Sequence, residues 1–80
     1  MATTVKTENG STYTFYKEKG RTFFKIGSLL FGEVEKFYEP IQRGGKIRIT
    51  YHRRRGNEFE PDMNYLESSK IEEVIKKSSS

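Results

Sequence analysis

Apolar and polar residues alternate along much of this chain, in short runs that glycines separate. The most regular run spans 46–52, where Ile47, Ile49 and Tyr51 are each flanked by polar residues. Alternation with a period of two puts every second side chain on the same face of a β-strand. We therefore predict a strand over 46–52 that buries these three residues and exposes the residues between them.

The first two predicted strands are joined by a hairpin whose loop spans 8–10. A three-residue loop with Gly10 in the left-handed conformation pairs Val5 with Tyr13, so that both lie on the apolar face. A two-residue loop at the same place shifts the register by one residue and puts Val5 on the opposite face. We therefore predict the three-residue loop.

A second tight turn, over 19–20, sets the register of the next pair of strands. It pairs Phe15 with Phe24 on the apolar face and Tyr16 with Phe23 on the other face. One aromatic pair therefore belongs to the predicted core, and the other lies outside it.

The remaining segments are shorter or less regular. Pro40 and Pro61 interrupt the pattern, as proline does where a strand ends or lies at a sheet edge. We predict an irregular apolar plug at 29–31, strands at 33–38 and 58–60, a loop at 53–57 and a further strand at 63–67. In the strand over 33–38, we expect Val34 and Tyr38 on one face.

The C-terminal segment 69–77 fits two kinds of element. Ser69 followed by Glu72 has the form of a helix capping box, and Ile71 and Ile75 are spaced as on one face of a helix. The same isoleucines also fit a strand that closes a barrel. We favour a short helix over 69–77 and keep the closing strand as the alternative.

The composition favours strands. Thr, Val and Ile number 16 and Phe and Tyr 11 among the 80 residues, whereas Ala occurs once. β-Branched and aromatic side chains lose rotamer freedom in helices and pack well in sheets. The predicted fold is mostly β, a small antiparallel barrel or sandwich of about five to seven short strands.

Length and residue usage limit the class of protein further. A chain of 80 residues suits one domain, which we place at 1–77, with 78–80 as a disordered tail. The chain has no cysteine and one histidine, so we expect no disulfide, no metal and no other cofactor. It has no apolar run of membrane-spanning length, and we expect a soluble, cytoplasmic protein without a membrane partner.

Three segments carry a resemblance in layout to small β-barrels. They are the hairpin Thr-Glu-Asn-Gly-Ser at 7–11, the strand Gly-Gly-Lys-Ile-Arg-Ile-Thr at 44–50 and the closing segment Ser-Ser-Lys-Ile at 68–71. The layout resembles that of SH3-like, Sm-like and oligonucleotide-binding barrels. The resemblance implies a small, closed antiparallel barrel.

Positive charge is concentrated in one part of the chain. Residues 43–55 contain six basic residues and no acidic one, whereas 56–80 contain six acidic and three basic residues. The six basic residues are Arg43, Lys46, Arg48, Arg53, Arg54 and Arg55. Arginine predominates among them, and its planar fork suits bidentate contact with phosphate and stacking on bases. Along an extended strand they form a stripe about 30 Å long, and we predict that this stripe binds DNA or RNA.

Two other roles of the basic stripe remain open. It can dock on an acidic protein, or it can be a solvated strand face whose arginines pair with acidic residues of the same chain. The acidic residues that follow the stripe in sequence are Glu58, Glu60, Asp62 and Glu67, and a hairpin brings Arg55 close to Glu58. The alternative function is therefore a protein-interaction or inhibitory module, of a size and charge common among prokaryotic and phage accessory proteins.

Tyr16 and Phe23 are the aromatic pair expected outside the core. With Lys25 beside them, they are candidates for a platform on which unpaired bases stack. In one alternative, the segment 29–31 covers these rings, or they belong to a second inner surface of the barrel. In another, they form the contact between two copies of the chain in a homodimer.

His52 is the candidate for catalysis. It can act as a general base beside Glu58 and Arg54 if a hairpin brings them together, as in small basic ribonucleases, with neighbouring arginines lowering its pKa. The sequence has no glycine-rich phosphate loop and no pair of aspartates to support a catalytic site. We therefore predict a binding module without enzymatic activity.

Overall fold

The computed structural model describes residues 2–77, and these form strands joined by turns and loops. The strands are β1 (Ala2–Thr7), β2 (Thr12–Glu18), β3 (Arg21–Ile26), β4 (Leu29–Phe37), β5 (Lys46–Arg55), β6 (Glu58–Phe59) and β7 (Asn64–Lys77). The predicted tail at 78–80 lies outside the described residues.

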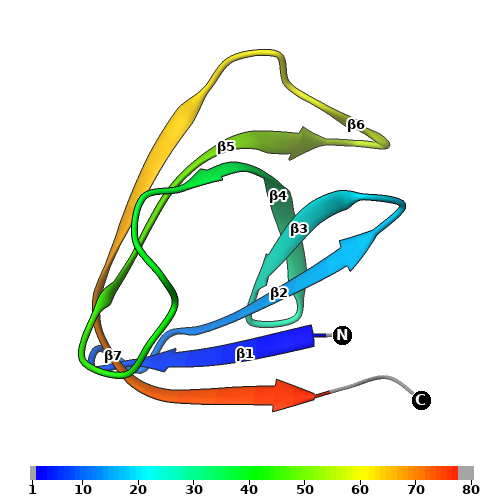
Figure 1. Cartoon of the computed structure of the whole chain (residues 1–80). Helices are drawn as coiled ribbons and strands as arrows, with labels where there is room; N and C mark the ends of the chain where they lie inside the picture. The colour runs from blue at the N-terminus through cyan, green and yellow to red at the C-terminus, as the bar shows by residue number, and fades with distance from the viewer. Residues whose placement is uncertain (1, 78–80) are drawn as a thin grey trace.

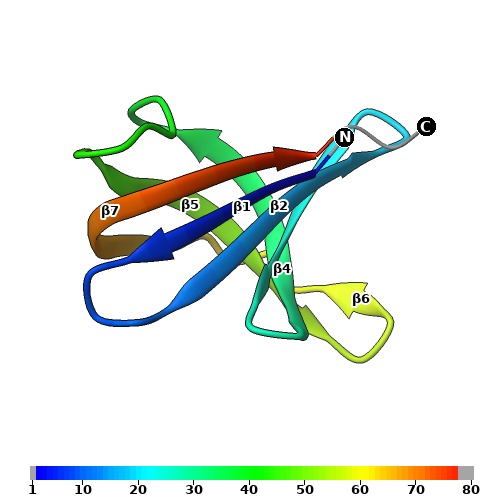
Figure 2. The same ribbon diagram turned by 90° about the horizontal axis from the view of Figure 1, so that it is seen from below.

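The strands form a closed antiparallel barrel. Neighbouring strands follow the order β4-β3-β2-β1-β7-β5, and β5 pairs in turn with β4, which closes a barrel of six strands. The short strand β6 continues the sheet beside the end of β5. Figure 1 shows β1 and β7 side by side, and Figure 2 shows the β5–β6 hairpin reaching past the barrel next to the turn between β3 and β4. The prediction of a small antiparallel β-barrel is confirmed.

The two hairpin registers predicted from the sequence are confirmed. Val5 pairs with Tyr13 across β1 and β2, and Gly10 has a φ of 87° in the loop between them. Phe15 pairs with Phe24 across β2 and β3. A positive φ suits glycine, which has no Cβ to clash with the backbone, and this explains the choice of the three-residue loop.

One core fills the barrel, and every strand except β6 contributes to it. The buried residues are Val5, Tyr13, Phe15, Phe24, Val34, Ile47, Ile49, Tyr51 and Ile71. Phe24 lies at the centre of the aromatic part, with its ring centroid 5.9 Å from that of Phe15 and 5.2 Å from that of Tyr51. The alternation predicted over 46–52 is confirmed, since Ile47 and Ile49 are fully buried.

The C-terminal segment is a strand, and the favoured helix over 69–77 is wrong. The first half of β7 pairs with β5 and its second half with β1, so β7 joins both edges that the barrel must close. Ile71, 1% exposed, lies in the core near the point where β7 changes partner. A register shift opposite Lys6 and Thr7 skips Glu72, and this bulge gives the apolar residues a spacing that resembles a helix. Without β7, the backbone N–H and C=O groups at the facing edges of β1 and β5 would lack hydrogen-bond partners, and a strand supplies these partners whereas a helix does not.

Two predicted irregular segments belong to strands instead. Residues 29–31 begin β4 rather than form an irregular plug; Leu29 is 62% exposed, whereas Phe31 packs against the core. Residues 53–55 end β5, which leaves only 56–57 as the hairpin tip. The strands predicted at 58–60 and 63–67 correspond to β6 and the start of β7.

The strand predicted at 33–38 overlaps β4 as far as Phe37, but one of its faces was assigned incorrectly. The register of β4 against β5 shifts between Val34 and Lys36. This bulge reverses which side chains point inward beyond it. Val34 is therefore buried whereas Tyr38 is 52% exposed, and the prediction that they share a face is wrong.

Candidate nucleic-acid interface

The basic residues at the start of β5 are paired with carboxylates. The Lys46 ammonium lies 3.5 Å from a Glu67 oxygen, and the Arg48 guanidinium lies 3.5 Å from Glu67 and 3.6 Å from Glu39. These ion pairs are exposed and individually weak. Together they offset the positive charge of this half of the predicted stripe.

Tyr65 links two members of this group. Arg48 Nε donates to the Tyr65 hydroxyl at 3.0 Å, and the hydroxyl donates to Glu67 Oε1 at 3.0 Å. The hydrogen bond from Tyr65 lowers the pKa of Glu67, desolvation opposes it, and the charges of Arg48 and Lys46 lower it further. Glu67 is therefore held in its charged form beside the two cations.

The three arginines at the end of β5 are arranged differently. Arg53, Arg54 and Arg55 are exposed, and none of them lies within ion-pair distance of a carboxylate among the residues described. The Arg53 guanidinium lies over the Phe31 ring, 5.4 Å from its centroid, and Arg54 Nε donates to the Gly56 carbonyl at 2.8 Å. Their positive charge is therefore uncompensated by close anions in this part of the structure.

The acidic segment after β5 does not neutralise these arginines. Arg55 faces Glu58 across the β5–β6 hairpin, but no ion pair joins the two side chains. Among residues 2–77, Glu60 and Asp62 also form no ion pair with an arginine. Of the four acidic residues considered, Glu67 alone pairs with the basic stripe, and it does so at the other end of β5.

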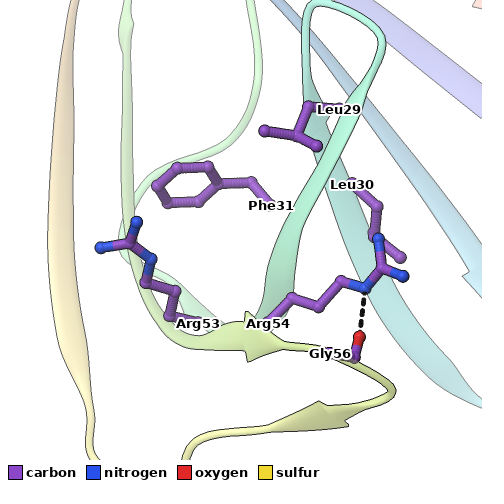
Figure 3. A pocket seen from close by; sticks show the side chains of 6 residues that line it. All are labelled: Leu29, Leu30, Phe31, Arg53, Arg54 and Gly56. Carbon is purple, nitrogen blue, oxygen red and sulfur yellow. Dashed lines mark hydrogen bonds between the residues drawn. The ribbon is translucent and has the colours of Figure 1, made fainter.

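A shallow open hollow lies beside the arginines (Figure 3). Its volume is about 230 Å³. It is lined by Leu29, Leu30, Phe31, Arg53, Arg54 and Gly56. No acidic side chain is among these residues, so the hollow is bounded by apolar and positively charged groups.

The hollow forms where β4 and β5 cease to pair. The register between them ends at the pair Gly32 and Arg53, so residues 29–31 of β4 have no strand on that side. Gly27, with a φ of 63°, turns the chain tightly between β3 and β4 and brings Leu29 to this end of the barrel. Figure 3 shows Arg53 on the side of Phe31 and Arg54 on the side of Leu30.

The structure separates the other predicted members of the stripe from the three arginines. Arg43 lies in the loop before β5, where it lines a different surface hollow with Lys6, Glu72 and Glu73. The six basic residues therefore form no continuous stripe.

The predicted stacking platform is largely covered. Phe23 is 9% exposed, because the Phe59 ring lies 5.3 Å from it and the Arg21 guanidinium 5.1 Å from its centroid. Tyr16 is half-buried, with its ring 5.6 Å from Phe23 and the Lys25 ammonium 5.8 Å from its own centroid. Phe23 is therefore covered, as one of the alternatives expected, but the covering residue is Phe59 rather than the segment 29–31.

His52 is hydrogen-bonded to Glu35 and Glu60 rather than to Glu58 or Arg54 as expected. Its Nε2 lies 3.3 Å from Glu35 Oε2 and its Nδ1 lies 3.0 Å from the Glu60 carbonyl oxygen, whereas Glu58 forms neither a hydrogen bond nor an ion pair with it. Partial desolvation lowers the pKa of His52, but the hydrogen bonds to Glu35 and to the carbonyls of Glu60 and Asp62 outweigh it and raise the pKa. The predicted lowering by arginines is wrong.

Sequence reasoning missed an exposed tyrosine pair. Tyr38 and Tyr65 are each 52% exposed, with ring centroids 6.2 Å apart in an edge-to-face arrangement. The Lys36 ammonium lies 5.0 Å from the Tyr38 centroid, and Arg48 is bonded to Tyr65. No local pattern indicates this pair, because the β4 bulge exposes Tyr38 and long-range pairing brings Tyr65 beside it.

No protein-family model, curated protein or solved structure matches the chain. Within residues 2–77 no helix is long and apolar enough to cross a membrane. The same residues hold no cluster of three or more metal-ligating side chains. The candidate site is therefore defined by its own geometry.

Proposed function

We propose that this protein is a non-catalytic binding module for nucleic acid, either DNA or RNA, and that Arg53–Arg55 carry the contact. The observation that carries the proposal is the contrast within β5. Its first basic residues, Lys46 and Arg48, are paired with carboxylates, whereas its last three arginines have no such partner among the residues described.

Arginine is suited to this role because its guanidinium can bind two phosphate oxygens at once. The closed barrel holds β5 in place, and the hairpin to β6 extends the strand as far as Arg55. Lys25 of β3 pairs in register with Leu30, so it adds positive charge near the same end of the barrel. Neutralising phosphates with these groups releases condensed counterions, which drives binding.

The basic residues contribute unequally to phosphate contact. Arg53, Arg54 and Arg55 make the main phosphate contacts. Arg43, Lys46 and Arg48 contribute less, because they lie toward the start of β5 and two of them are engaged in ion pairs. Tyr16 contributes through its exposed part only, and Phe23 contributes to packing.

The test is fluorescence anisotropy of labelled oligonucleotides, single- and double-stranded, titrated with the protein. If the three arginines, with or without Lys25, neutralise three or four phosphates, affinity falls by about 40- to 150-fold between about 50 and about 200 mM salt. Replacing Arg53–Arg55 by glutamine should remove most of this salt dependence together with the binding.

A matched variant controls for net charge. Lys17, Lys19 and Lys70 are exposed, form no ion pair among the residues described and do not line the hollow beside Arg53 and Arg54. Replacing these three lysines by glutamine removes the same charge and should lower affinity far less. Equal losses of affinity in the two variants would show that net charge alone explains the binding. An affinity that is unchanged when Arg53–Arg55 are replaced rejects the site.

A second candidate function, protein binding, is favoured by the pair of Tyr38 and Tyr65. Exposed tyrosines next to arginine are typical of the residues that dominate protein interfaces. Beside them Arg48 is paired with Glu39 and Glu67, so the charge of this arginine is compensated, unlike that of Arg53–Arg55.

The two candidates can be separated with one pair of variants. Replacing Tyr38 and Tyr65 by serine should leave oligonucleotide affinity within about twofold, because neither residue lies at the end of β5. If the tyrosines bind protein, the same variant loses a partner that the arginine variant retains. Sedimentation velocity identifies the case in which that partner is a second copy of the chain.

A further inference from the structure

We infer that the hollow beside Arg53 and Arg54 receives one unstacked nucleobase, so that the module binds single strands in preference to duplex. This inference rests on the proposed function and deepens it. It places the base contact on residues 29–31 of β4 rather than on Tyr16 and Phe23.

The wall of the hollow is apolar and held in place. Leu29 is 62% exposed and has no core contact that explains an apolar residue there. Phe31 is half-buried, and its ring packs 5.6 Å from those of Phe24 and Tyr51 in the core. The wall therefore offers a fixed apolar surface, which is what the flat face of a base requires.

The two arginines flank this surface from β5. Arg53 lies over the Phe31 ring, and Arg54 lies toward Leu30, as Figure 3 shows. Arg54 uses one of its five N–H donors on the Gly56 carbonyl, and the others are available to a ligand. A base against the wall thus has positive charge beside it, where the phosphates of the same strand lie.

Size and charge select the ligand. The hollow of about 230 Å³ is smaller than the roughly 300–1,000 Å³ pockets that enclose drug-sized molecules, so it holds a single ring system. The absence of acidic side chains from its lining favours an anionic ligand. A nucleobase on a phosphate backbone meets both conditions.

A duplex does not present its bases in this way. In a duplex each base is stacked and paired, so extruding one costs free energy that a single strand does not pay. The phosphates remain accessible to Arg53–Arg55 in both forms. Single strands therefore gain the base contact in addition to the phosphate contacts, and duplexes gain the phosphate contacts alone.

The experiment compares single-stranded and duplex oligonucleotides of one length by fluorescence anisotropy. Replacing Leu29 and Leu30 by serine should weaken single-strand binding by about 5- to 10-fold, as expected for losing the burial of about one to two methylene groups against the base. Duplex binding should change by less than about twofold. Met63→Ser is the matched control, since Met63 is 54% exposed and lies away from the hollow.

A second measurement leaves the protein unchanged. An oligonucleotide with abasic sites keeps every phosphate and removes the bases, and it should bind the wild-type protein about as weakly as duplex does. Equal binding of the abasic and the normal strand overturns the base contact. So does an equal loss for single strand and duplex in the leucine variant.

These outcomes are distinct from failure of the proposed function. If the base contact fails while Arg53–Arg55 variants still lose binding to both forms, the arginine site stands and the hollow is excluded. If the wild-type protein binds no oligonucleotide even at about 50 mM salt, where phosphate contacts are strongest, both are overturned. Urea unfolding of each variant establishes that a lost affinity does not reflect a lost fold.

Discussion

Phe59 of β6 packs against Phe23 of β3, with ring centroids 5.3 Å apart, on the outside of the barrel. The Arg21 guanidinium lies over both rings, 5.1 Å from the Phe23 centroid and 5.5 Å from that of Phe59. A two-residue strand such as β6 has little stability of its own. This aromatic contact therefore holds the hairpin against the barrel and fixes the direction in which Arg53–Arg55 are presented.

Phe59→Ala should release the β5–β6 hairpin while leaving the barrel folded. Because Phe59 is half-buried, we expect a loss of about 1–3 kcal/mol in the free energy of unfolding, less than for a core phenylalanine. Amide exchange of residues 54–59 should become faster than that of β1. Tyr38→Ala is the control, and an equal loss of stability there, or unchanged exchange at 54–59, contradicts this role.

The barrel was largely predictable because its signals are local. The pairing of Val5 with Tyr13 depends on one glycine loop, and the alternation over 46–52 is complete within one strand. Hairpin register and strand alternation are determined by residues that are close together in sequence, so both can be predicted from the sequence alone.

The features that were mispredicted depend on long-range contacts. Ile71 and Ile75 fit helix and strand alike, and the edges of β1 and β5 decide in favour of the strand. Phe23 is covered by Phe59, which is distant in sequence. For the same reason charge counting alone did not separate Lys46 and Arg48, whose carboxylate partners come from other elements, from Arg53–Arg55, which have no such partner within residues 2–77.

Gly32→Ala should destabilise the barrel at the place where β4 meets β5. A Cβ at Gly32 would lie 2.6 Å from the His52 carbonyl oxygen and 3.1 Å from the Tyr51 ring, so the backbone of β5 has to move. We expect a loss of about 1–3 kcal/mol in the free energy of unfolding, as for overpacked cores. This is the opposite of the usual effect, since alanine in a strand is normally more stable than glycine. Urea unfolding measures this loss.

Gly45→Ala is the matched control for that variant. A Cβ there would come no closer than 3.3 Å to a flexible Glu39 oxygen and 3.4 Å to the Gln42 carbonyl. Its stability should stay within about 1 kcal/mol of the wild type. Equal stabilities of the two alanine variants would show that the close approach of β4 and β5 does not exclude a side chain at position 32.

Glu33 should stabilise the fold at neutral pH and lose this effect in acid. Arg21 donates through Nε to Glu33 Oε2 at 2.9 Å and through Nη2 to Oε1 at 2.6 Å. This hydrogen bonding lowers the pKa of Glu33 below its ordinary value of 4.5, against partial desolvation. A lowered pKa in the folded state means that the stabilisation is present above pH 4.5 and is lost as the pH falls through the folded-state pKa.

Glu33→Gln tests this dependence. The variant should be less stable than the wild type at pH 7, and the two urea midpoints should converge as the pH falls below about 4. Glu8→Gln, at an exposed position in the β1–β2 loop, is the control and should show no such convergence. A difference that stays constant with pH would assign the effect of Glu33 to packing rather than to charge.

His52 should act in the opposite direction, stabilising the fold more in mild acid than in base. Hydrogen bonds to Glu35 and to the Glu60 carbonyl raise its pKa above the ordinary 6.5, so the stabilisation is complete below pH 6.5 and lost as the pH rises through the folded-state pKa. The stability difference between wild type and His52→Gln should therefore shrink between about pH 5.5 and about pH 8.5. An NMR titration that places the His52 pKa below 6.5 refutes this prediction.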